Sequence, residues 1–255
     1  MSSVLSIGTT HPQNVAGVGR DIAVMMHFGV TCFTVVAAVS AQDESGVVAL
    51  HPLDATLVAE QLAVMPWERI AAVRIGALVT VENIAMVERF LRERDLPVVI
   101  DPVLGASKGG RFYDATAYAC LQDMLLGLPT AIITPNLLEA AHLLGVAELR
   151  DDGMLEAATA LHDRGARAIV LKGGHRTHGS DDLLVDEHGA QWFTGDRIAA
   201  TMPGTGCTFA AALAAGLANR RPLAAAVEDA RNCVRSELLR ASKGSLVPST
   251  NPGGP

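Results

Sequence analysis

A short glycine-rich segment ahead of an alanine-rich run is the part of the sequence best suited to chemistry. Residues 203–208 read PGTGCT. Two glycines allow a sharp turn that brings several main-chain N–H groups toward one point, where the dipole of the following helix adds positive potential. This predicts an anion site that suits phosphate. Because Cys207 would lie in the first helical turn, we expect a lowered thiol pKa and a thiolate able to take a proton from an attacking hydroxyl.

A structural interpretation of the same segment is that it forms only a tight loop and that Cys207 is a small buried residue, as lone cysteines commonly are. Taken alone, the segment supports both interpretations equally. Four further motifs favour the chemical one, since each directly follows a predicted strand: GTT at 8–10, DPV at 101–103, TPN at 134–136 and KGGH at 172–175. In open α/β sheets, ligands bind beyond the carboxyl ends of the strands.

Three of these motifs carry charged or polar side chains suited to a bound phosphate or metal ion. Asp101 could orient a metal ion through water, and Lys172 would emerge beside phosphate groups. Asn136 and Glu139 lie three residues apart at a predicted helix start and therefore share one face. The alternatives are a turn former at Asp101, a helix cap at Asn136 and a solvated surface lysine at 172.

The elements that must position these residues alternate between short β-rich runs and longer helical segments. Strands are predicted at residues 4–8, 31–40, 70–75, 98–101, 131–134 and 168–171. Between them, apolar residues at helical spacing predict helices at 54–65, 81–94, 115–126, 136–144 and 153–164. A hairpin of 183–186 with 191–194 follows, and then two alanine-rich helices at 208–218 and 223–241. The pattern predicts a mostly parallel sheet with helices on both faces.

The bulk composition limits the classes of protein. The chain has 255 residues and a formal net charge of −7, which argues against a nucleic-acid binder. No apolar stretch approaches the length of a membrane span, and no leader-like start is present, so we expect no membrane contact and a cytoplasmic location. Its four cysteines show no metal spacing and are expected to be reduced. We predict one domain over residues 1–244 and a disordered tail over 245–255.

In this order the motifs resemble the ribokinase superfamily, and within it the hydroxymethylpyrimidine/phosphomethylpyrimidine kinases of thiamine biosynthesis. Further carriers of the resemblance are AGV at 16–18 with Asp21, SAQ at 40–42 followed by GV at 46–47, and RIG at 74–76. The resemblance runs from about residue 6 to 216. It implies a ribokinase-like three-layer sandwich, ATP and Mg²⁺ as cofactors, a small pyrimidine as substrate, and a homodimer.

The resemblance also implies roles for individual residues. The catalytic group comprises Gly204, Thr205 and Gly206 as the anion hole, with Cys207 as proton acceptor. ATP would be bound by Asn136, Glu139, Lys172, Gly174 and Thr208, and the metal by Asp101 and Glu139. The substrate would be bound by Gly8, Asp21, Gln42, Ala77 and Val103. A cap for the nearby helix is the alternative for Asp21, and an ordinary surface position is the alternative for Gln42.

The chain departs from the family pattern on the acceptor side. Its first loop, residues 10–15, is one residue longer; Ala77 stands where the family has Met; and residues 107–110 read SKGG where the family has KSGD. One hypothesis is that the enzyme handles mainly the pyrimidine monophosphate, with His11, Arg20 or Lys108 neutralising the added phosphate. The alternatives are a pyridoxal or pyridoxine kinase, and a non-catalytic pyrimidine-binding protein on the same fold.

Overall fold

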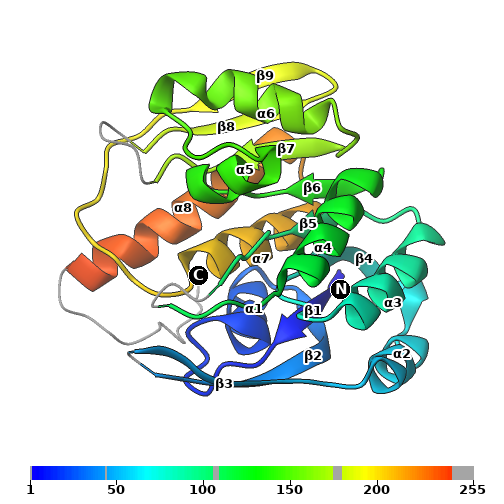
Figure 1. The fold of residues 1–255 in the computed structure, drawn as a ribbon. Coiled ribbons are helices and arrows are strands. Elements are labelled where there is room, and N and C mark those ends of the chain that lie inside the picture. Colours follow the sequence, from blue (N-terminus) through cyan, green and yellow to red (C-terminus); the bar gives the residue numbers. More distant parts are fainter. Residues whose placement is uncertain (1, 44, 106–108, 175–179, 243–255) are drawn as a thin grey trace.

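One twisted sheet organises the molecule, as the alternating pattern predicts. The computed structural model describes residues 2–43, 45–105, 109–174 and 180–242. Within these ranges the strand order is β3-β2-β1-β4-β5-β6-β7-β8-β9 (Figure 1). Strands β2, β1, β4, β5, β6 and β7 are parallel, whereas β3, β8 and β9 are antiparallel to their neighbours. The strands are β1 Ser3–Thr9, β2 Thr31–Asp43, β3 Gly46–Pro52, β4 Ile70–Ile75, β5 Val98–Ile100, β6 Ala131–Ile133, β7 Ala168–Leu171, β8 Asp182–Asp186 and β9 Gly189–Phe193.

Helices cover both faces of the sheet (Figure 1). One apolar cluster joins the sheet to α1, α7 and α8, and a second joins it to α2, α3, α4, α5 and α6. The helices are α1 Gly17–His27, α2 Ala55–Ala63, α3 Val81–Arg92, α4 Ala115–Gly127, α5 Leu137–Leu144, α6 Met154–His162, α7 Thr205–Ala218 and α8 Leu223–Ser242, with short 3₁₀ turns at Trp67–Arg69 and Asp151–Gly153. The predicted layers are thus confirmed.

The alanine-rich α7 lies directly on the sheet. Its residues 208–216 are all buried, and it contacts β1, β4 and β5. Small side chains permit this close approach. The helix begins at Thr205, three residues earlier than predicted, because Gly204 takes a left-handed conformation (φ +80°) and ends the preceding loop there. The earlier start places Cys207 in the first turn.

The edge strand β3 was not predicted. Strand β2 continues past residue 40 to Asp43 and pairs with β3, for example Ala41 with Ala49. Its sequence, GVVALHP, does contain an apolar run of strand length, which was the available signal. Most of β3 is nevertheless partly or fully exposed. The hairpin matters for the site because the Val47 N–H donates to the Gly109 carbonyl oxygen at 3.2 Å, which joins it to the loop after β5.

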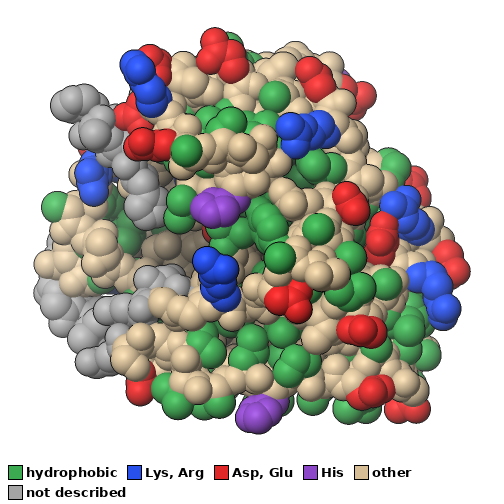
Figure 2. Space-filling view, viewed as in Figure 1, with side chains coloured by type: hydrophobic (Ala, Val, Ile, Leu, Met, Phe, Trp, Pro, Cys, Tyr) green, Lys and Arg blue, Asp and Glu red, His purple; other side chains and the backbone are tan. Residues whose placement is uncertain are grey.

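Several sequence expectations fall on residues that the structure does not describe: His175, Ser107, Lys108 and the tail 245–255. None of the helices in the described ranges is both long and apolar enough to cross a bilayer. All four cysteines carry free thiols. On the face shown in Figure 2, Lys and Arg side chains lie singly among Asp and Glu rather than in one run.

Candidate active site

The glycine-rich loop before α7 is held against neighbouring main chain. A Cβ at Gly204 would lie 1.8 Å from the Val15 carbonyl oxygen, so no larger residue fits there. At Gly206 a Cβ would lie 3.1 Å from Asp101 Oδ2 and 3.4 Å from Lys172 Nζ. The loop therefore packs directly on two oppositely charged groups that follow other strands, at the edge of the sheet where open α/β folds bind ligands.

Arg74, near the end of β4, lies at the centre of the site. It is 1 % exposed, and its guanidinium faces Asp21 (Nη1 to Oδ2, 3.3 Å) and Asp101 (Nη2 to Oδ2, 3.7 Å). Arg74 and Cys207 also interact electrostatically, so that each affects the pKa of the other. Burial alone would lower the pKa of Arg74, but the surrounding negative groups outweigh it and raise the pKa, so Arg74 is a permanent cation.

In the sequence, Arg74 is part of the RIG motif at 74–76, and no function was predicted for it. The available signal was a charged residue inside the otherwise apolar strand IAAVRI. A buried cation of this kind needs partners, and here the partners are the predicted site carboxylates.

Asp21 is fully buried in α1 and does not cap that helix, whose N-cap is Ala16. Its Oδ2 accepts a hydrogen bond from Ser6 Oγ at 2.6 Å. Burial raises the pKa of Asp21, whereas Arg74 and Ser6 act in the opposite direction. Within the described residues, Asp21 Oδ1 has no hydrogen-bond partner, and neither has Arg74 Nε or Nη2. Unpaired buried polar atoms are uncommon in folded proteins.

Lys172 directly follows β7 and its side chain turns inward. Its main-chain N–H donates to the Pro135 carbonyl oxygen at 2.8 Å, and its ammonium group contacts Asp101 Oδ1 at 3.1 Å. Burial would lower the pKa of Lys172, but Asp101 and Glu139 outweigh it and raise the pKa. The surface-lysine interpretation is therefore wrong. Gly174, two residues further on, is exposed, and apart from its chain neighbours no atom of the described residues would lie within 4 Å of a Cβ there.

Asn136 and Glu139 form a reciprocal capping box at the start of α5. Asn136 Oδ1 accepts from the Glu139 N–H at 2.9 Å, and Glu139 Oε2 accepts from the Asn136 N–H at 2.8 Å. The helix-cap interpretation is confirmed, and it leaves a ligand role open. Burial raises the pKa of Glu139 to about 7, with Lys172 opposing and Asp101 adding to the rise.

The prediction of a lowered pKa for Cys207 is wrong. Burial raises the pKa of this thiol; Asp101 and Asp21 add to the rise, whereas Arg74 and the N–H of Gly17 oppose it. The helix dipole favours the thiolate, but the two nearby carboxylates disfavour it, and the sequence does not show that they lie close to Cys207. Taken over the whole residue, Cys207 has an intermediate exposure.

The predicted acceptor-side residues lie at or just after the ends of strands: Gly8 and Gln42 near the ends of β1 and β2, and Ala77 and Val103 after β4 and β5. A Cβ at Gly8 would lie 3.7 Å from Arg74 Nη1, and the Val103 N–H donates to the Asp101 carbonyl oxygen at 2.8 Å. Gln42 Nε2 donates to Ser40 Oγ at 2.9 Å. Ala77 lies in the apolar cluster beyond β4. Gly8 and Val103 thus lie beside Arg74 and its two aspartates, Gln42 lies on the hairpin of β2 and β3, and Ala77 is buried in the apolar core.

Two polar residues expected at ligands lie elsewhere. Thr208 is fully buried. Its Oγ1 accepts a hydrogen bond from Arg20 Nε at 2.9 Å and donates one to Glu237 Oε2 at 3.4 Å. Its main-chain N–H donates to the Gly204 carbonyl oxygen. Arg20 also pairs with Glu237 on α8. We therefore assign Thr208 and Arg20 to the support of the loop from behind, and leave both out of the proposed ligand sites.

His11 cannot serve as a ready cation at neutral pH. Burial lowers the pKa of this imidazole, and its Nδ1 accepts a hydrogen bond from the Gln13 N–H at 3.2 Å. Of the three residues suggested to neutralise an extra phosphate, His11 is uncharged, Arg20 faces away, and Lys108 lies outside the described residues.

A magnesium ion carried by a nucleotide fits the carboxylates present. In the described ranges no three His, Cys, Asp or Glu side chains group closely enough to hold a metal ion by themselves. Mg²⁺ commonly keeps several waters and binds through one or two carboxylates plus substrate phosphates. Asp101 and Glu139 both interact electrostatically with Lys172. They therefore suit a metal ion that is bound by one or two carboxylates together with nucleotide phosphates.

A family model described as phosphomethylpyrimidine kinase matches residues 12–246. The chain belongs to this family. It is 33 % identical over 246 residues to the hydroxymethylpyrimidine/phosphomethylpyrimidine kinase of Haemophilus influenzae, covering 93 % of this chain and 91 % of the relative. It is 35 % identical over 243 residues to the thiamine biosynthesis bifunctional protein of Geobacter sulfurreducens, which covers 94 % of this chain; the chain spans about half (49 %) of that relative.

Solved structures of this family and of pyridoxal kinases share the fold. A phosphomethylpyrimidine kinase from Clostridium difficile has a TM-score of 0.80 at 25 % identity, covering 95 % of this chain and 100 % of that one. The pyridoxal kinase of Staphylococcus aureus in complex with ADP has a TM-score of 0.83 at 28 % identity, covering 93 % and 88 %. The predicted fold class and kinase family are confirmed.

We predict that Glu139→Gln stabilises the nucleotide-free protein at pH 8. Two cations, Arg74 and Lys172, already face two aspartates, so an ionised Glu139 adds an unbalanced buried charge. Its folded pKa of about 7 lies above the ordinary value of 4.5, so its favourable contribution is present below about pH 4.5 and is lost as pH rises through 7. Glutamine keeps the capping oxygen.

Thermal unfolding without nucleotide or Mg²⁺ measures this effect. The midpoint of Glu139→Gln should exceed that of the wild type by a few degrees at pH 8, and the difference should shrink as the pH falls and vanish below about pH 4.5. The exposed first-turn Glu82 of α3, replaced by Gln, controls for the loss of a helix N-terminal charge. A midpoint below the wild type at pH 8 would contradict the prediction.

Proposed function

We propose that the protein transfers the terminal phosphoryl group of ATP to 4-amino-5-hydroxymethyl-2-methylpyrimidine, to its monophosphate, or to both. The observation that carries this proposal is the meeting of three features at one sheet edge: the glycine loop before α7, the Lys172–Asp101 pair and the Arg74–Asp21 pair. Phosphoryl transfer depends mainly on positioning and charge neutralisation, and these features supply both. Family membership supports the chemistry.

The nucleotide side of the proposed site comprises Asn136, Glu139, Lys172 and Gly174. Lys172 places a fixed positive charge at the end of β7, and the exposed Gly174 lets a ligand approach the main chain. When bound, Mg²⁺ would add positive charge to the nucleotide phosphates, and Asp101 and Glu139 are the residues that would hold it. Solved relatives of this fold hold ADP and AMP-PCP, which supports ATP as the donor.

The loop of Gly204, Thr205 and Gly206 would stabilise charge on the migrating phosphoryl group through main-chain N–H groups at the start of α7. Cys207 directly follows this loop and, in its thiolate form, would accept the proton of the attacking hydroxyl. Because burial raises its pKa, the resting thiol is protonated, and Arg74 is the cation that stabilises the thiolate when it forms. Turnover should therefore rise with pH above neutrality.

The acceptor side comprises Gly8, Asp21, Gln42, Ala77 and Val103. The unpaired Asp21 Oδ1 is a buried acceptor suited to an amino group of the pyrimidine. Gln42 can both donate to a ring nitrogen and accept from an amino group. Ala77 and Val103 supply apolar surface. A site built from such paired groups selects strongly against analogues that cannot form the same bonds.

A pyridoxal kinase activity is the second candidate. A structure of the Staphylococcus aureus pyridoxal kinase in complex with pyridoxal matches this fold with a TM-score of 0.83 at 28 % identity. Pyridoxal, like the pyrimidine, carries a hydroxymethyl group on an aromatic ring.

An acceptor panel tests the proposal. ADP formation from ATP and Mg²⁺ would be measured with the hydroxymethylpyrimidine, its monophosphate, pyridoxal and pyridoxine, with ribose as an unrelated alcohol. We expect the highest kcat/KM with one of the two pyrimidines. A clear preference for pyridoxal or pyridoxine would favour the second candidate. ADP formation with none of them would favour a non-catalytic pyrimidine-binding protein.

We predict that Cys207→Ala lowers kcat by about 10²- to 10⁴-fold, the usual contribution of a proton acceptor, with much less effect on the KM for ATP. Cys207→Ser should also be slow, because a hydroxyl ionises less readily than a thiol. Cys233→Ala on α8 is the matched control, since this partly buried thiol lines the cavity between α1 and α8. Unchanged turnover in Cys207→Ala would remove the thiol from the mechanism.

A further inference from the structure

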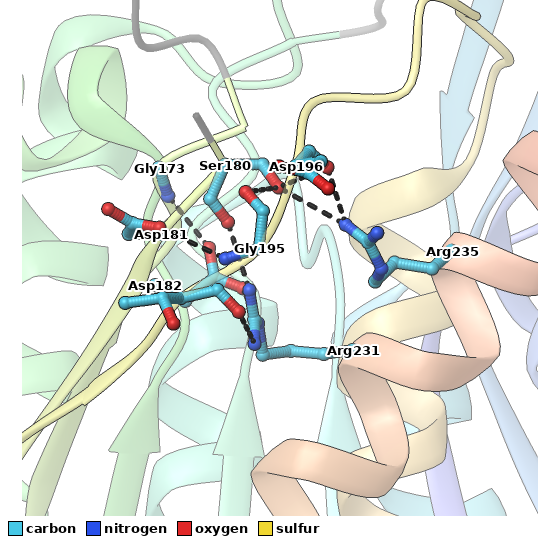
Figure 3. Close-up of polar contacts among 9 residues, drawn as sticks. Gly173, Ser180, Asp181, Asp182, Gly195, Asp196, Arg231 and Arg235 are labelled. Carbon is cyan, nitrogen blue, oxygen red and sulfur yellow. Dashed lines mark hydrogen bonds and ion pairs between the residues drawn. The ribbon is translucent and has the colours of Figure 1, made fainter. Parts of the chain in front are cut away.

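A second buried ion pair lies behind the nucleotide side, where β8 begins. Asp182 is 9 % exposed, and its two carboxylate oxygens have different partners. Oδ1 accepts from the main-chain N–H of Gly173 at 2.8 Å, and Oδ2 accepts from Arg231 Nε at 2.8 Å (Figure 3). One carboxylate therefore connects the loop after Lys172 to helix α8.

Arg231 is held on several sides. Its Nη2 donates to the Ser180 carbonyl oxygen at 3.0 Å, and its guanidinium lies 5.8 Å from the ring centroid of Phe193. One helical turn later, Arg235 donates to the Asp196 carbonyl oxygen at 2.7 Å (Figure 3). Both arginines project from α8 toward the segments that flank β8 and β9. Asp182 is thus anchored by a rigid helix rather than by a loop.

The Asp182 contact falls next to the proposed phosphate-binding lysine. Lys172 and Gly173 are adjacent, and the Lys172 ammonium contacts Asp101 at 3.1 Å. On its other side, the Lys172 N–H is bonded to the Pro135 carbonyl oxygen. With the Gly173 N–H bonded to Asp182, two successive main-chain N–H groups are fixed. The path of the chain from Lys172 into the exposed Gly174 follows from these two bonds.

Within the described residues, Asp182 forms no hydrogen bond or ion pair with Arg74, Cys207 or the glycine loop. Any effect of Asp182 on the proposed site must therefore pass through residues 172–174. The Asp182 carboxylate is buried in spite of the free-energy cost of taking a charge out of water. Burial raises the pKa of Asp182, and Arg231, the Gly173 N–H and Lys172 oppose the rise. The Asp182–Arg231 ion pair alone would join β8 to α8, and the additional bond to Gly173 is not needed for that contact.

We propose that Asp182, held by Arg231, is a positioning residue for the ATP phosphates: it fixes the Gly173 N–H and thereby the nucleotide-binding conformation of residues 172–174. This inference rests on the proposed function. It assigns to Asp182 a role in nucleotide affinity and none in acceptor recognition.

Three variants separate positioning from stability. Asp182→Ala removes both bonds. Asp182→Asn keeps an oxygen that accepts from the Gly173 N–H but loses the charge. The double variant Asp182→Leu with Arg231→Met replaces the buried pair by apolar side chains, which often restores stability, yet offers Gly173 no acceptor. Asp229→Asn is the matched control, because the Arg221–Asp229 pair at 2.9 Å also involves α8 and is more exposed.

Affinity for AMP-PCP with Mg²⁺, measured by titration calorimetry, is the main readout, with the unfolding midpoint measured alongside. We expect about tenfold weaker binding for Asp182→Ala and for the double variant, the order of effect of losing one bond to a charged group. Asp182→Asn should bind within about twofold of the wild type even where its midpoint falls, and Asp229→Asn should bind as the wild type does. The KM for the acceptor should stay unchanged in all four.

Two results would overturn the inference: wild-type affinity in the double variant, or losses of affinity that follow the unfolding midpoints across all variants. Should Asp182→Ala fail to fold, the double variant and Asp182→Asn still decide the question. Because this titration needs no acceptor, its outcome is distinct from that of the proposed function. A wild-type protein that binds AMP-PCP but phosphorylates no acceptor would overturn the proposed function alone.

Discussion

The site depends on the burial of one guanidinium group between two carboxylates. Arg74 comes from the middle of the sheet, Asp21 from α1 and Asp101 from the loop after β5. Taking charges out of water is expensive, and removing one partner of such a buried pair typically costs about 3–5 kcal/mol. The arrangement therefore holds Asp21, on the proposed acceptor side, and Asp101, on the proposed nucleotide side, in a fixed relation. The Cys207 thiol interacts electrostatically with all three of these charged groups.

Small residues make this packing possible. A Cβ at Gly76 would lie 2.2 Å from Arg74 Nη1, so the RIG motif leaves the space that the guanidinium fills. The alanines of α7 let the glycine loop reach the same cluster, and the bonds from Thr208 to Arg20 and Glu237 hold the first turn of α7 from behind. Charged groups at the ligand edge are thus supported by small residues beneath them and by ion pairs on α8.

Periodicity and strand-end motifs predicted the parallel sheet, its helical layers and most of the residues that meet at its ligand edge. They failed where the outcome depends on which side chains face each other across the fold. The thiol pKa of Cys207 is raised because burial and two aspartates outweigh the local helix dipole, and neither aspartate is near it in sequence. Thr208 belongs to the loop motif, yet its side chain points to Arg20 and Glu237. Arg74 was visible only as a charge in an apolar strand.

The pH dependence of Cys207 alkylation tests the central role of Arg74 most directly. The rate of iodoacetamide labelling at Cys207, followed by mass spectrometry, would be compared across pH in the wild type, Arg74→Lys and Arg74→Met. If Arg74 stabilises the thiolate, Arg74→Met shifts the labelling profile to higher pH, and Arg74→Lys shifts it less. An identical profile in the wild type and a folded Arg74→Met would contradict the account.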